Sequence, residues 1–337
     1  MPTHPVDALL ALHPGVCWGI MNPMHDFTQH HWQAQTERDF ERLLELALFE
    51  DTETQGDLTS LLLLSTADQG SATVVARTAG ILAGVPLIPK IVSAVEPKLV
   101  WEPILDDSAE LFPGAIVGTI RGSARAILKA ERLVLNFLGR LSGVATLTQR
   151  YVDAIRGTTA HIYDTRKTTP GWRRLEKYAV HCGGGRNHRT GLYDAVLIKD
   201  NHLALGRQGA HPFSPARAVQ QAKELLRTWY TELPIVEVEV DTLDQLREVL
   251  PAGPDIVLLD NMTPAQITEA IQIRNMVNPN VQLEASGGIT LETVRAIAET
   301  GVERISVGAL THSAVSLDFG LDWASPPQGL TTVNKPH

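Results

Sequence analysis

The chain has 337 residues and a formal net charge of -9, from 29 Lys and Arg against 38 Asp and Glu. This length suits one large domain or two modest ones, and the proportions of 44% hydrophobic and 20% charged residues are ordinary for a globular protein. The acidic balance argues against nucleic acid as a partner, and the two cysteines, Cys17 and Cys182, exclude a disulfide framework and suit a reducing cytosol.

An apolar stretch at residues 9–21 has some of the composition of a signal peptide. However, no Lys or Arg precedes it, and the sequence His13-Pro14-Gly15 interrupts it. No run in the sequence approaches the roughly 18 apolar residues that a membrane helix needs. We therefore expect a cytoplasmic protein with no membrane partner.

The first part of the chain mixes helical and strand-like patterns. Residues 1–34 are weakly periodic and predict an N-terminal extension that is only partly ordered. From Asp39 the apolar spacing predicts a helix that ends at Gly56-Asp57-Leu58-Thr59. Strands are expected next at 72–76, 80–84 and 111–120, followed by a long helix at 123–136. This order predicts a domain in which strands and helices are mixed.

The second part alternates regularly between strand and helix. Helices are expected at 215–229, 243–250, 264–276 and 291–299, and β-rich runs at 161–164, 195–198, 235–240, 256–259, 281–285 and 304–307. Alternation of this kind implies parallel strands joined by crossovers, and apolar runs such as 256–259 suit strands buried on both faces. The pattern predicts an α/β barrel with fewer than eight strands, or an open parallel sheet.

Polar residues follow almost every one of these six runs. The strand ends carry Asp164 to Lys167, Lys199 to His202, Glu239, Asp260 with Asn261, Glu284 to Gly288, and Gly308 with Ala309. In α/β barrels the carboxyl ends of the strands converge on one mouth, where active sites lie. A single charged strand end is usually a solvated edge, but six together predict a site.

Two of these strand ends predict phosphate binding. The sequence Ser286-Gly287-Gly288 follows one strand and precedes a helix, and Gly308-Ala309 does the same one unit later. Glycines let backbone N–H groups approach a phosphate closely, and a helix N-terminus adds a favourable dipole. Glycines also close ordinary turns, so the pairing of the two sites is what carries the prediction.

Basic residues gather between Asp164 and Lys199, in a chain that is acidic overall. They are Arg166, Lys167, Arg173, Arg174, Lys177, Arg186, Arg189 and Lys199. Arg173, Arg174 and Lys177 could equally form the solvated face of a helix. The others follow a strand or the triple glycine 183–185, and they predict a ligand with several negative charges.

Glu239 and Asp260 must face these cations at the same mouth. They could bind Mg²⁺ held by a diphosphate, stabilise positive charge on a sugar carbon, or bind ribose hydroxyls. The alternative is an internal ion-pair network with Lys199 or Arg166.

Long motifs in both regions occur in the order found in one known family. In the second region they are 165–171, 183–189, 197–202, 237–240, 259–261, 284–288 and 307–313. Shorter ones precede them at 50–51, 56–59, 131–132, 136 and 141–146. Over about residues 38–322 the chain resembles the quinolinate phosphoribosyltransferases. The extension before residue 35 is a departure, because the family generally lacks it.

The resemblance implies an α/β protein with two domains. An N-terminal α/β sandwich at 35–145, rejoined by about 313–337, would pack on an open, incomplete barrel of six to seven strands at 146–312. The resemblance also implies a homodimer, or a higher oligomer built from it, in which one subunit's sandwich covers the partner's barrel mouth.

The resemblance further assigns roles to residues. Arg132 would reach the partner's quinolinate, while Arg166, His188, Arg189 and Lys199 bind the acid's carboxylates and nearby phosphate, lined by Thr165 and Lys167. Glu239 and Asp260 would face the ribose and Mg²⁺, and Lys199, Glu239 and Asp260 would serve catalysis. The 5-phosphate would lie against Ser286, Gly287, Gly288, Gly308, Ala309 and His312.

The implied substrates are quinolinate and phosphoribosyl pyrophosphate, with Mg²⁺ and no organic cofactor. The product is nicotinate mononucleotide for NAD biosynthesis, formed with loss of carbon dioxide. Three other functions stay open: a nicotinate phosphoribosyltransferase, a phosphate-binding barrel aldolase that uses Lys199, and a non-catalytic phosphosugar-binding protein.

Overall fold

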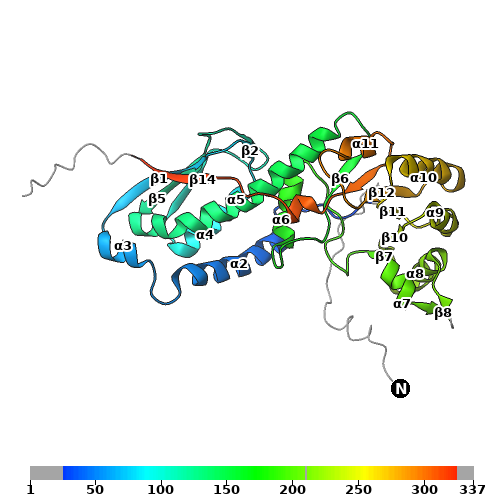
Figure 1. Cartoon of the computed structure of the whole chain (residues 1–337). Coiled ribbons are helices and arrows are strands. Elements are labelled where there is room, and N and C mark those ends of the chain that lie inside the picture. Colours follow the sequence, from blue (N-terminus) through cyan, green and yellow to red (C-terminus); the bar gives the residue numbers. More distant parts are fainter. Residues whose placement is uncertain (1–25, 209–210, 325–337) are drawn as a thin grey trace, which may run out of the picture.

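The computed structural model describes residues 26–208 and 211–324. Two large sheets organise this part of the chain. One is a four-stranded antiparallel sheet in the order β14-β1-β5-β3, and the other is a six-stranded parallel sheet in the order β6-β13-β12-β11-β10-β7. Figure 1 shows the sheets at opposite ends of an elongated molecule, with the long helix α5 running between them.

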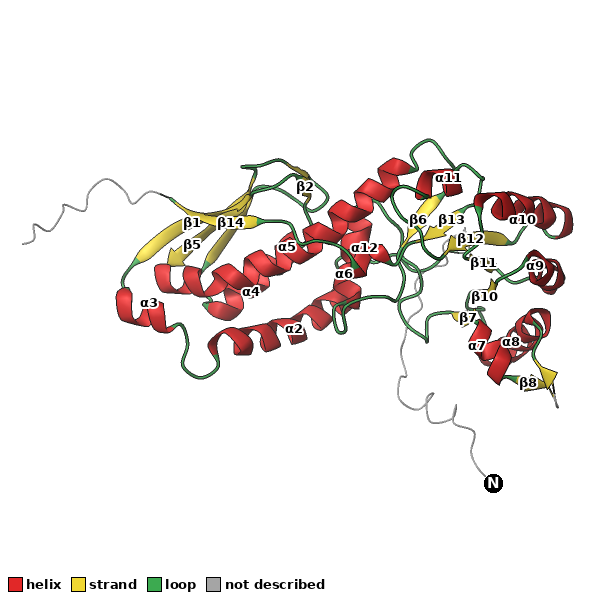
Figure 2. Ribbon diagram, in the orientation of Figure 1, coloured by secondary structure: helices red, strands yellow, loops and turns green. Residues whose placement is uncertain are grey.

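The antiparallel sheet belongs to the first domain. Its strands are β1 (Gln69–Ala76), β3 (Val100–Pro103), β5 (Ile116–Ser123) and β14 (Phe319–Trp323), and a small pair, β2 (Gly80–Ile81) and β4 (Glu110–Leu111), lies beside it. The helices are α2 (Ala34–Thr52), α3 (Leu58–Leu63), η1 (Val85–Leu87), α4 (Ile88–Val95) and α5 (Ala124–Ala154). Figure 2 shows these helices gathered along one side of the sheet.

The predicted elements of this domain are confirmed in type but not in length. The predicted helix at 123–136 continues to Ala154, because its apolar positions keep helical spacing and bury residues such as Ile127, Val134 and Leu141. The helix expected from Asp39 begins earlier, at Ala34, and ends at Thr52. The sequence after it starts a new helix, since the Asp57 side chain accepts a hydrogen bond from Ser60 N at 3.1 Å and caps α3. The strand expected at 80–84 is reduced to Gly80–Ile81.

The chain returns to the first sheet after the second domain. Strand β14 pairs antiparallel with β1, from Ala72 opposite Trp323 to Ala76 opposite Phe319. On the way it passes α5 at Gly143, where a Cβ atom would lie 2.2 Å from the carbonyl oxygen of Val315. Only glycine therefore allows this close approach, and the crossing fixes the returning segment against α5.

The parallel sheet belongs to the second domain. Its strands are β6 (His161–Tyr163), β7 (Val196–Ile198), β10 (Val236–Val240), β11 (Ile256–Asp260), β12 (Gln282–Ser286) and β13 (Arg304–Ser306). The helices are α6 (Arg173–Cys182), α7 (Asp200–Leu205), α8 (Pro215–Trp229), α9 (Leu243–Val249), η2 (Leu250–Ala252), α10 (Pro264–Val277), α11 (Val294–Ala298) and α12 (Ala309–His312), with a small hairpin of β8 (Arg207–Gln208) and β9 (His211–Pro212).

All six predicted strands of this domain are confirmed, and the barrel they form is open. Among the described residues no strand joins β7 to β6, which lie at the two edges of the sheet. Instead, the extended segment at Arg186 runs parallel to β6, with Arg186 N donating to Ile162 O at 2.8 Å and Asp164 N donating to Arg186 O at 3.0 Å. The predicted architecture, an incomplete α/β barrel joined to a domain with a small sheet, is therefore confirmed.

The register of the parallel strands decides which side chains share a face. Glu239 pairs with Leu258, Leu258 with Glu284, and Glu284 with Arg304. Because side chains alternate along a strand, the residues two positions from these lie on the same face. Charged groups therefore line the concave face at two levels, one at the carboxyl ends of the strands and one inside the barrel.

In the described part of the chain, no helix is both long and apolar enough to cross a membrane.

Candidate active site

The mouth of the barrel brings together most of the residues predicted for the site. The strand ends of β6, β7, β10, β11, β12 and β13 open onto it, as in other α/β barrels. We call the following residues the mouth cluster: Lys167, Lys199, Glu239, Asp260, Gly287 and Gly308.

Lys199 and Glu239 contact each other across neighbouring strands. The Lys199 ammonium lies in hydrogen-bond contact with the Glu239 carboxylate, and the Lys199 side chain is 43% exposed. The ion pair that the sequence left open as an alternative therefore exists. The Glu239 side chain is only 10% exposed, so it is the Lys199 side of the pair that faces solvent. The Lys199 charge therefore remains accessible to a second anion.

Asp260 stands on the strand next to Glu239, at the last position of β11. Its carboxylate accepts a hydrogen bond from Asn261 Nδ2 at 2.7 Å. Asn261 has a left-handed backbone with φ 54°, and its backbone N donates to Ser286 O at 2.9 Å. Gly287 has φ 94°, and a Cβ atom there would lie 2.1 Å from Asn261 Oδ1. Gly287 is therefore required both by its backbone and by the close approach of Asn261.

A second contact joins the first and last strands of the domain at the mouth. Thr311 Oγ1 donates to Lys167 O at 2.6 Å, so the loop after β6 is bound to α12 after β13. A Cβ atom on Gly308 would lie 2.9 Å from Lys167 Cδ and 3.3 Å from His312 Nε2. Lys167, Gly308 and His312 thus form one corner of the mouth. Ala309 begins α12 there, and Thr165 Oγ1 accepts from Lys167 N at 3.0 Å.

On the other side of the loop after β12, Gly288 is exposed, with φ 60° and nothing within 4 Å of where its Cβ atom would lie. Ser286, Gly287 and Gly288 thus form a second glycine corner beside Asp260.

Arg166 and Arg189 lie close enough to influence each other. Arg189 is 5% exposed, and its guanidinium donates to Ala195 O at 3.1 Å. Burial lowers the pKa of Arg189, and the charge of Arg166 lowers it further. The Nε atoms of both residues are buried and have no hydrogen-bond partner among the described residues. Unsatisfied buried donors of this kind are available to an anionic ligand.

His188 lies deeper than the mouth cluster, inside the barrel. Its Nε2 is 3.0 Å from Glu237 Oε2 and 3.5 Å from Glu284 Oε1, and its Nδ1 accepts a hydrogen bond from Arg189 N at 2.8 Å. Burial alone would lower the pKa of His188, but the two carboxylates outweigh it and raise the pKa above its usual value. His188 is thus adjacent to Arg189 in the site, with its imidazole directed toward interior acids.

Other charged groups surround His188. Arg304 Nε donates to Glu284 Oε2 at 2.9 Å, and its guanidinium lies 3.7 Å from the Tyr163 ring centroid. Lys177 contacts Asp164 and donates to His188 O at 2.7 Å. We call the following residues the interior network: Asp164, Lys177, His188, Glu237, Glu284 and Arg304.

Several members of the interior network were named from the sequence, but their burial together as one network was not predicted. The reading of Lys177 as part of a solvated helix face is wrong, because its side chain is fully buried against Asp164. Arg174 is only partly exposed and pairs with Asp39 at 2.9 Å. The available signal was Asp164, the acid of its strand end, which needs a cationic partner once it is buried.

The structure does not bring Arg132 to this mouth within the described chain. Arg132 lies on α5, its side chain is 66% exposed, and its polar contact in the described part of the molecule is Glu131 at 2.9 Å.

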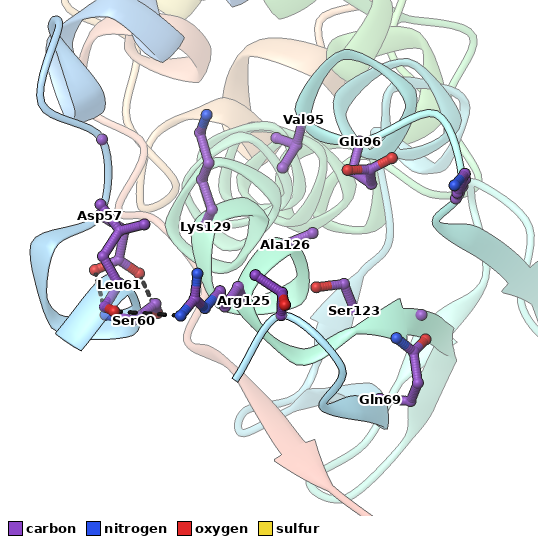
Figure 3. Close-up of a pocket in the computed structure, with 14 residues that line it drawn as sticks. Asp57, Ser60, Leu61, Gln69, Val95, Glu96, Ser123, Arg125, Ala126 and Lys129 are labelled. Carbon is purple, nitrogen blue, oxygen red and sulfur yellow. Dashed lines mark hydrogen bonds between the residues drawn. The ribbon is translucent and has the colours of Figure 1, made fainter. Parts of the chain in front are cut away.

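A separate pocket of about 490 Å³ lies on the first domain. Figure 3 shows Arg125 and Lys129 extending from α5, with Asp57, Ser60 and Leu61 lining the pocket beside them. None of the predicted site residues lines it. This pocket is therefore distinct from the barrel mouth of the same chain.

Comparisons with known proteins agree with the two-domain organisation. Residues 57–142 match the family model for the N-terminal domain of quinolinate phosphoribosyl transferase, and residues 144–322 match that for its C-terminal domain. The chain is 42% identical over 278 residues to the carboxylating nicotinate-nucleotide pyrophosphorylase of Mycobacterium leprae, covering 82% of this chain and 94% of that one. It is 40% identical over 281 residues to a probable enzyme of the same name from Bacillus subtilis, covering 83% and 92%.

A solved structure of the nicotinate-nucleotide pyrophosphorylase from Francisella tularensis is also similar. It superimposes with a TM-score of 0.79 at 36% identity, covering 89% of this chain and all of that one. Matches of this length and identity extend over both domains and the whole barrel mouth. The chain belongs to the quinolinate phosphoribosyltransferase family.

Proposed function

We propose that this chain transfers the phosphoribosyl group of phosphoribosyl pyrophosphate to quinolinate. The products are nicotinate mononucleotide, pyrophosphate and carbon dioxide, in the synthesis of NAD. The observation that carries the proposal is the mixed charge of the mouth cluster, in which Glu239 and Asp260 lie on adjacent strands among the cations of neighbouring strand ends. A dicarboxylic acid and a phosphorylated sugar together need both kinds of charge.

The cations are assigned to the acid. Quinolinate has two carboxylates, and Lys199, Arg166 and Arg189 can supply a partner to each. Arg166 and Arg189 have unsatisfied buried Nε donors, and Lys199 is exposed enough to exchange Glu239 for a substrate carboxylate. We expect Thr165 and Lys167 to complete this side of the site, while His188, whose Nδ1 accepts from Arg189 N, supports Arg189 from inside the barrel.

The glycine corners are assigned to the 5-phosphate. Ser286, Gly287 and Gly288 follow β12, while Gly308, Ala309 and His312 follow β13. Because glycine has no Cβ atom, the backbone N–H groups at these corners can approach a phosphate closely. Lys167, which lies beside Gly308, adds a positive charge.

The carboxylates of Glu239 and Asp260 fit Mg²⁺, because this ion prefers oxygen ligands and usually binds one or two carboxylates together with substrate phosphates. When bound, Mg²⁺ would neutralise negative charge on the leaving pyrophosphate. We expect no organic cofactor.

The proposed reaction has two bond changes. The ring nitrogen of quinolinate forms a bond to the anomeric carbon as the bond to pyrophosphate breaks, and Glu239 and Asp260 stabilise the positive charge that develops on the sugar. The product ring is a pyridinium, which accepts the electron pair of the 2-carboxylate as carbon dioxide leaves. A proton then takes the vacant ring position.

The aldolase alternative is disfavoured by the surroundings of Lys199. A Schiff-base lysine needs a desolvated amine, whereas Lys199 is 43% exposed and paired with a carboxylate. A nicotinate enzyme would need cations for one carboxylate, and this mouth holds cations for two.

We further propose that the active protein is a homodimer, or a higher oligomer of it, in which Arg132 acts in the partner's mouth. Exposed leucines on α3, with exposed fractions from 50% to 83%, support an interface near this face: Leu58, Leu61, Leu62 and Leu63. Cytoplasmic location is part of the proposal, and the free, buried Cys182 suits a reducing compartment.

The test is an assay of purified protein with quinolinate, phosphoribosyl pyrophosphate and Mg²⁺. We expect mononucleotide and carbon dioxide in equal amounts. Chelation of Mg²⁺ with EDTA should abolish turnover without unfolding the protein, and added Mg²⁺ should restore it. Absence of carbon dioxide release would refute the reaction, and full activity in excess chelator would refute the role of Mg²⁺.

The shared site has its own test. Arg132→Ala and Lys199→Ala should each be nearly inactive, and mixing them after dissociation should create heterodimers with one intact site. Random pairing gives about a quarter of all sites intact if the dimer has a two-fold axis. No recovery, with heterodimers present by mass, would show that Arg132 does not act in the partner.

A further inference from the structure

The segment before α2 occupies the end of the barrel opposite the mouth. Phe27 is 4% exposed and packs against Ala195, Ile235 and Ile256, each at or just before the start of a strand. The family match of the first domain begins only at residue 57. Residues 26–30, which we call the arm, therefore close the base of the barrel with a feature outside that match.

Charge anchors the arm to the interior network. Asp26 Oδ1 accepts from Arg304 Nη1 at 2.9 Å, and Asp26 Oδ2 accepts from the Tyr163 hydroxyl at 2.9 Å and lies 3.3 Å from Arg186 Nη1. The Asp26 side chain is 6% exposed. Arg304 already pairs with Glu284, so Asp26 supplies it with a second carboxylate. Removing one partner of such a buried pair is costly, which makes the placement of the arm specific.

Gln29 and His30 form hydrogen bonds to the segment that carries Arg189. The Gln29 amide bonds to Asn187 in both directions, accepting from its N at 2.8 Å and donating to its O at 3.2 Å. His30 N donates to Asn187 Oδ1 at 2.7 Å, and His30 Nε2 lies 2.7 Å from Thr190 Oγ1. Phe27 stacks on the His188 imidazole with centroids 4.3 Å apart. Residues on both sides of Arg189 are thus held by the arm.

Among the described residues, Arg189 itself forms no hydrogen bond or ion pair with the arm. Its backbone N donates to His188 Nδ1, and its guanidinium extends toward Ala195 with a buried Nε free of partners in the described structure. The direction of the guanidinium therefore depends on the backbone of residues 187–190, which the arm holds through Asn187 and Thr190. A cation held rigidly binds a carboxylate without first losing conformational freedom.

We propose that Phe27, Gln29 and His30 are positioning residues for quinolinate binding, which they serve by fixing residues 187–190 and hence the guanidinium of Arg189. This inference rests on the proposed function, in which Arg189 binds the acid. It predicts that loosening the arm weakens binding of the acid and leaves the binding of phosphoribosyl pyrophosphate unchanged, because the glycine corners lie on other strands.

The experiment compares Gln29→Ala with Thr28→Ala in the full chain. Gln29→Ala removes both bonds to Asn187, whereas Thr28 is exposed and adjacent, and serves as the matched control. We expect Gln29→Ala to raise KM for quinolinate about tenfold with little change in kcat or in KM for phosphoribosyl pyrophosphate. Thr28→Ala should match the unchanged protein. Phe27→Leu should act like Gln29→Ala, because it keeps apolar volume but loses the ring stack.

A purely structural arm gives a different result. Trp32→Ala disturbs the chain beside the arm where it packs on Phe40 and Tyr178, away from Arg189, and should lower the melting temperature without raising KM for quinolinate. If Gln29→Ala and Trp32→Ala change both KM values alike, or if Gln29→Ala leaves KM for quinolinate unchanged, the inference is overturned.

Amide hydrogen exchange over residues 187–190 separates this inference from the proposed function. Exchange should be faster in Gln29→Ala than in Thr28→Ala, whether or not the protein turns over quinolinate. Unchanged exchange would overturn the inference, whereas an unmutated protein that is inactive with quinolinate would refute the proposed function instead.

Discussion

The mouth cluster and the interior network contain the same kinds of charged side chain in the same barrel, yet they are organised differently. In the interior, Lys177 and Asp164 are fully buried and each has several partners. At the mouth, Lys199 and Glu239 form a single pair that is partly open to solvent. Buried pairs depend strongly on one another, whereas a half-exposed pair contributes little to stability and can exchange its partner. The comparison separates charges that hold the barrel together from charges that are free to bind a ligand.

Replacing Lys199 with alanine should give the largest effect on activity. We expect kcat/KM for quinolinate to fall at least about a hundredfold, because a charged partner of the substrate is lost, while the free energy of unfolding changes by less than about 1 kcal/mol. Lys90→Ala is the matched control, since Lys90 forms a similar ion pair with Glu37 and is 45% exposed. Steady-state kinetics and urea denaturation measure both quantities. Equal loss of activity in the two variants would contradict the assignment of Lys199.

Replacing Lys177 with methionine tests the interior in the same way. Methionine keeps most of the volume but leaves Asp164 buried without its cation, so we expect a loss of about 3–5 kcal/mol in the free energy of unfolding. The second change Asp164→Asn should recover part of this loss, which denaturation of the double variant would show. A loss below about 1 kcal/mol for Lys177→Met would mean that the interior pair resembles the one at the mouth.

These two regions also differ in how far the sequence predicted them. The mouth was predictable because the carboxyl ends of parallel strands meet at one edge, so Lys199, Glu239 and Asp260 follow from the strand pattern alone. The six strands were predicted from β-rich runs that alternate with helical stretches, and the type of the long helix after Ser123 was also predicted correctly. The roles of the individual mouth residues remain predictions.

The interior network and the arm could not be predicted in this way. Lys177 lies on a helix rich in Arg and Lys, and only the three-dimensional packing shows that one of these cations is buried against Asp164. Residues 26–34 are described and make defined contacts, whereas the sequence indicated only a partly ordered extension. The rest of that extension, residues 1–25, lies outside the described residues. Contacts between residues about 160 positions apart, such as His30 with Thr190, leave no local pattern.

The slope of stability against pH tests whether His30, a residue of the arm, is held neutral in the folded chain. Burial lowers the pKa of His30 to about 3, with further lowering by Lys177, Arg174, His31 and His181. Below pH 6.5 the unfolded chain therefore binds a proton that the folded chain does not, and stability should fall as the pH falls toward 3. His30→Gln should remove up to about 1.4 kcal/mol per pH unit of this slope.

The test compares the pH slope of stability in His30→Gln with that in the unchanged protein, because His188 contributes a slope of the opposite sign to both. Its pKa is raised, so the stability it contributes is present at low pH and is lost as the pH rises through the folded pKa. Identical slopes for His30→Gln and the unchanged protein, measured by urea denaturation between pH 4 and 6.5, would show that His30 is not held neutral in the folded state.

The most direct test of the central claim is the ratio of kcat/KM for quinolinate to that for nicotinate. If Lys199, Arg166 and Arg189 bind the acid, the mouth offers cations for two carboxylates. An acid with one carboxylate leaves a desolvated cation unpaired, and sites that lose such a partner discriminate strongly. We predict a ratio of at least about a thousand in favour of quinolinate. Comparable values of kcat/KM for the two acids would contradict the account.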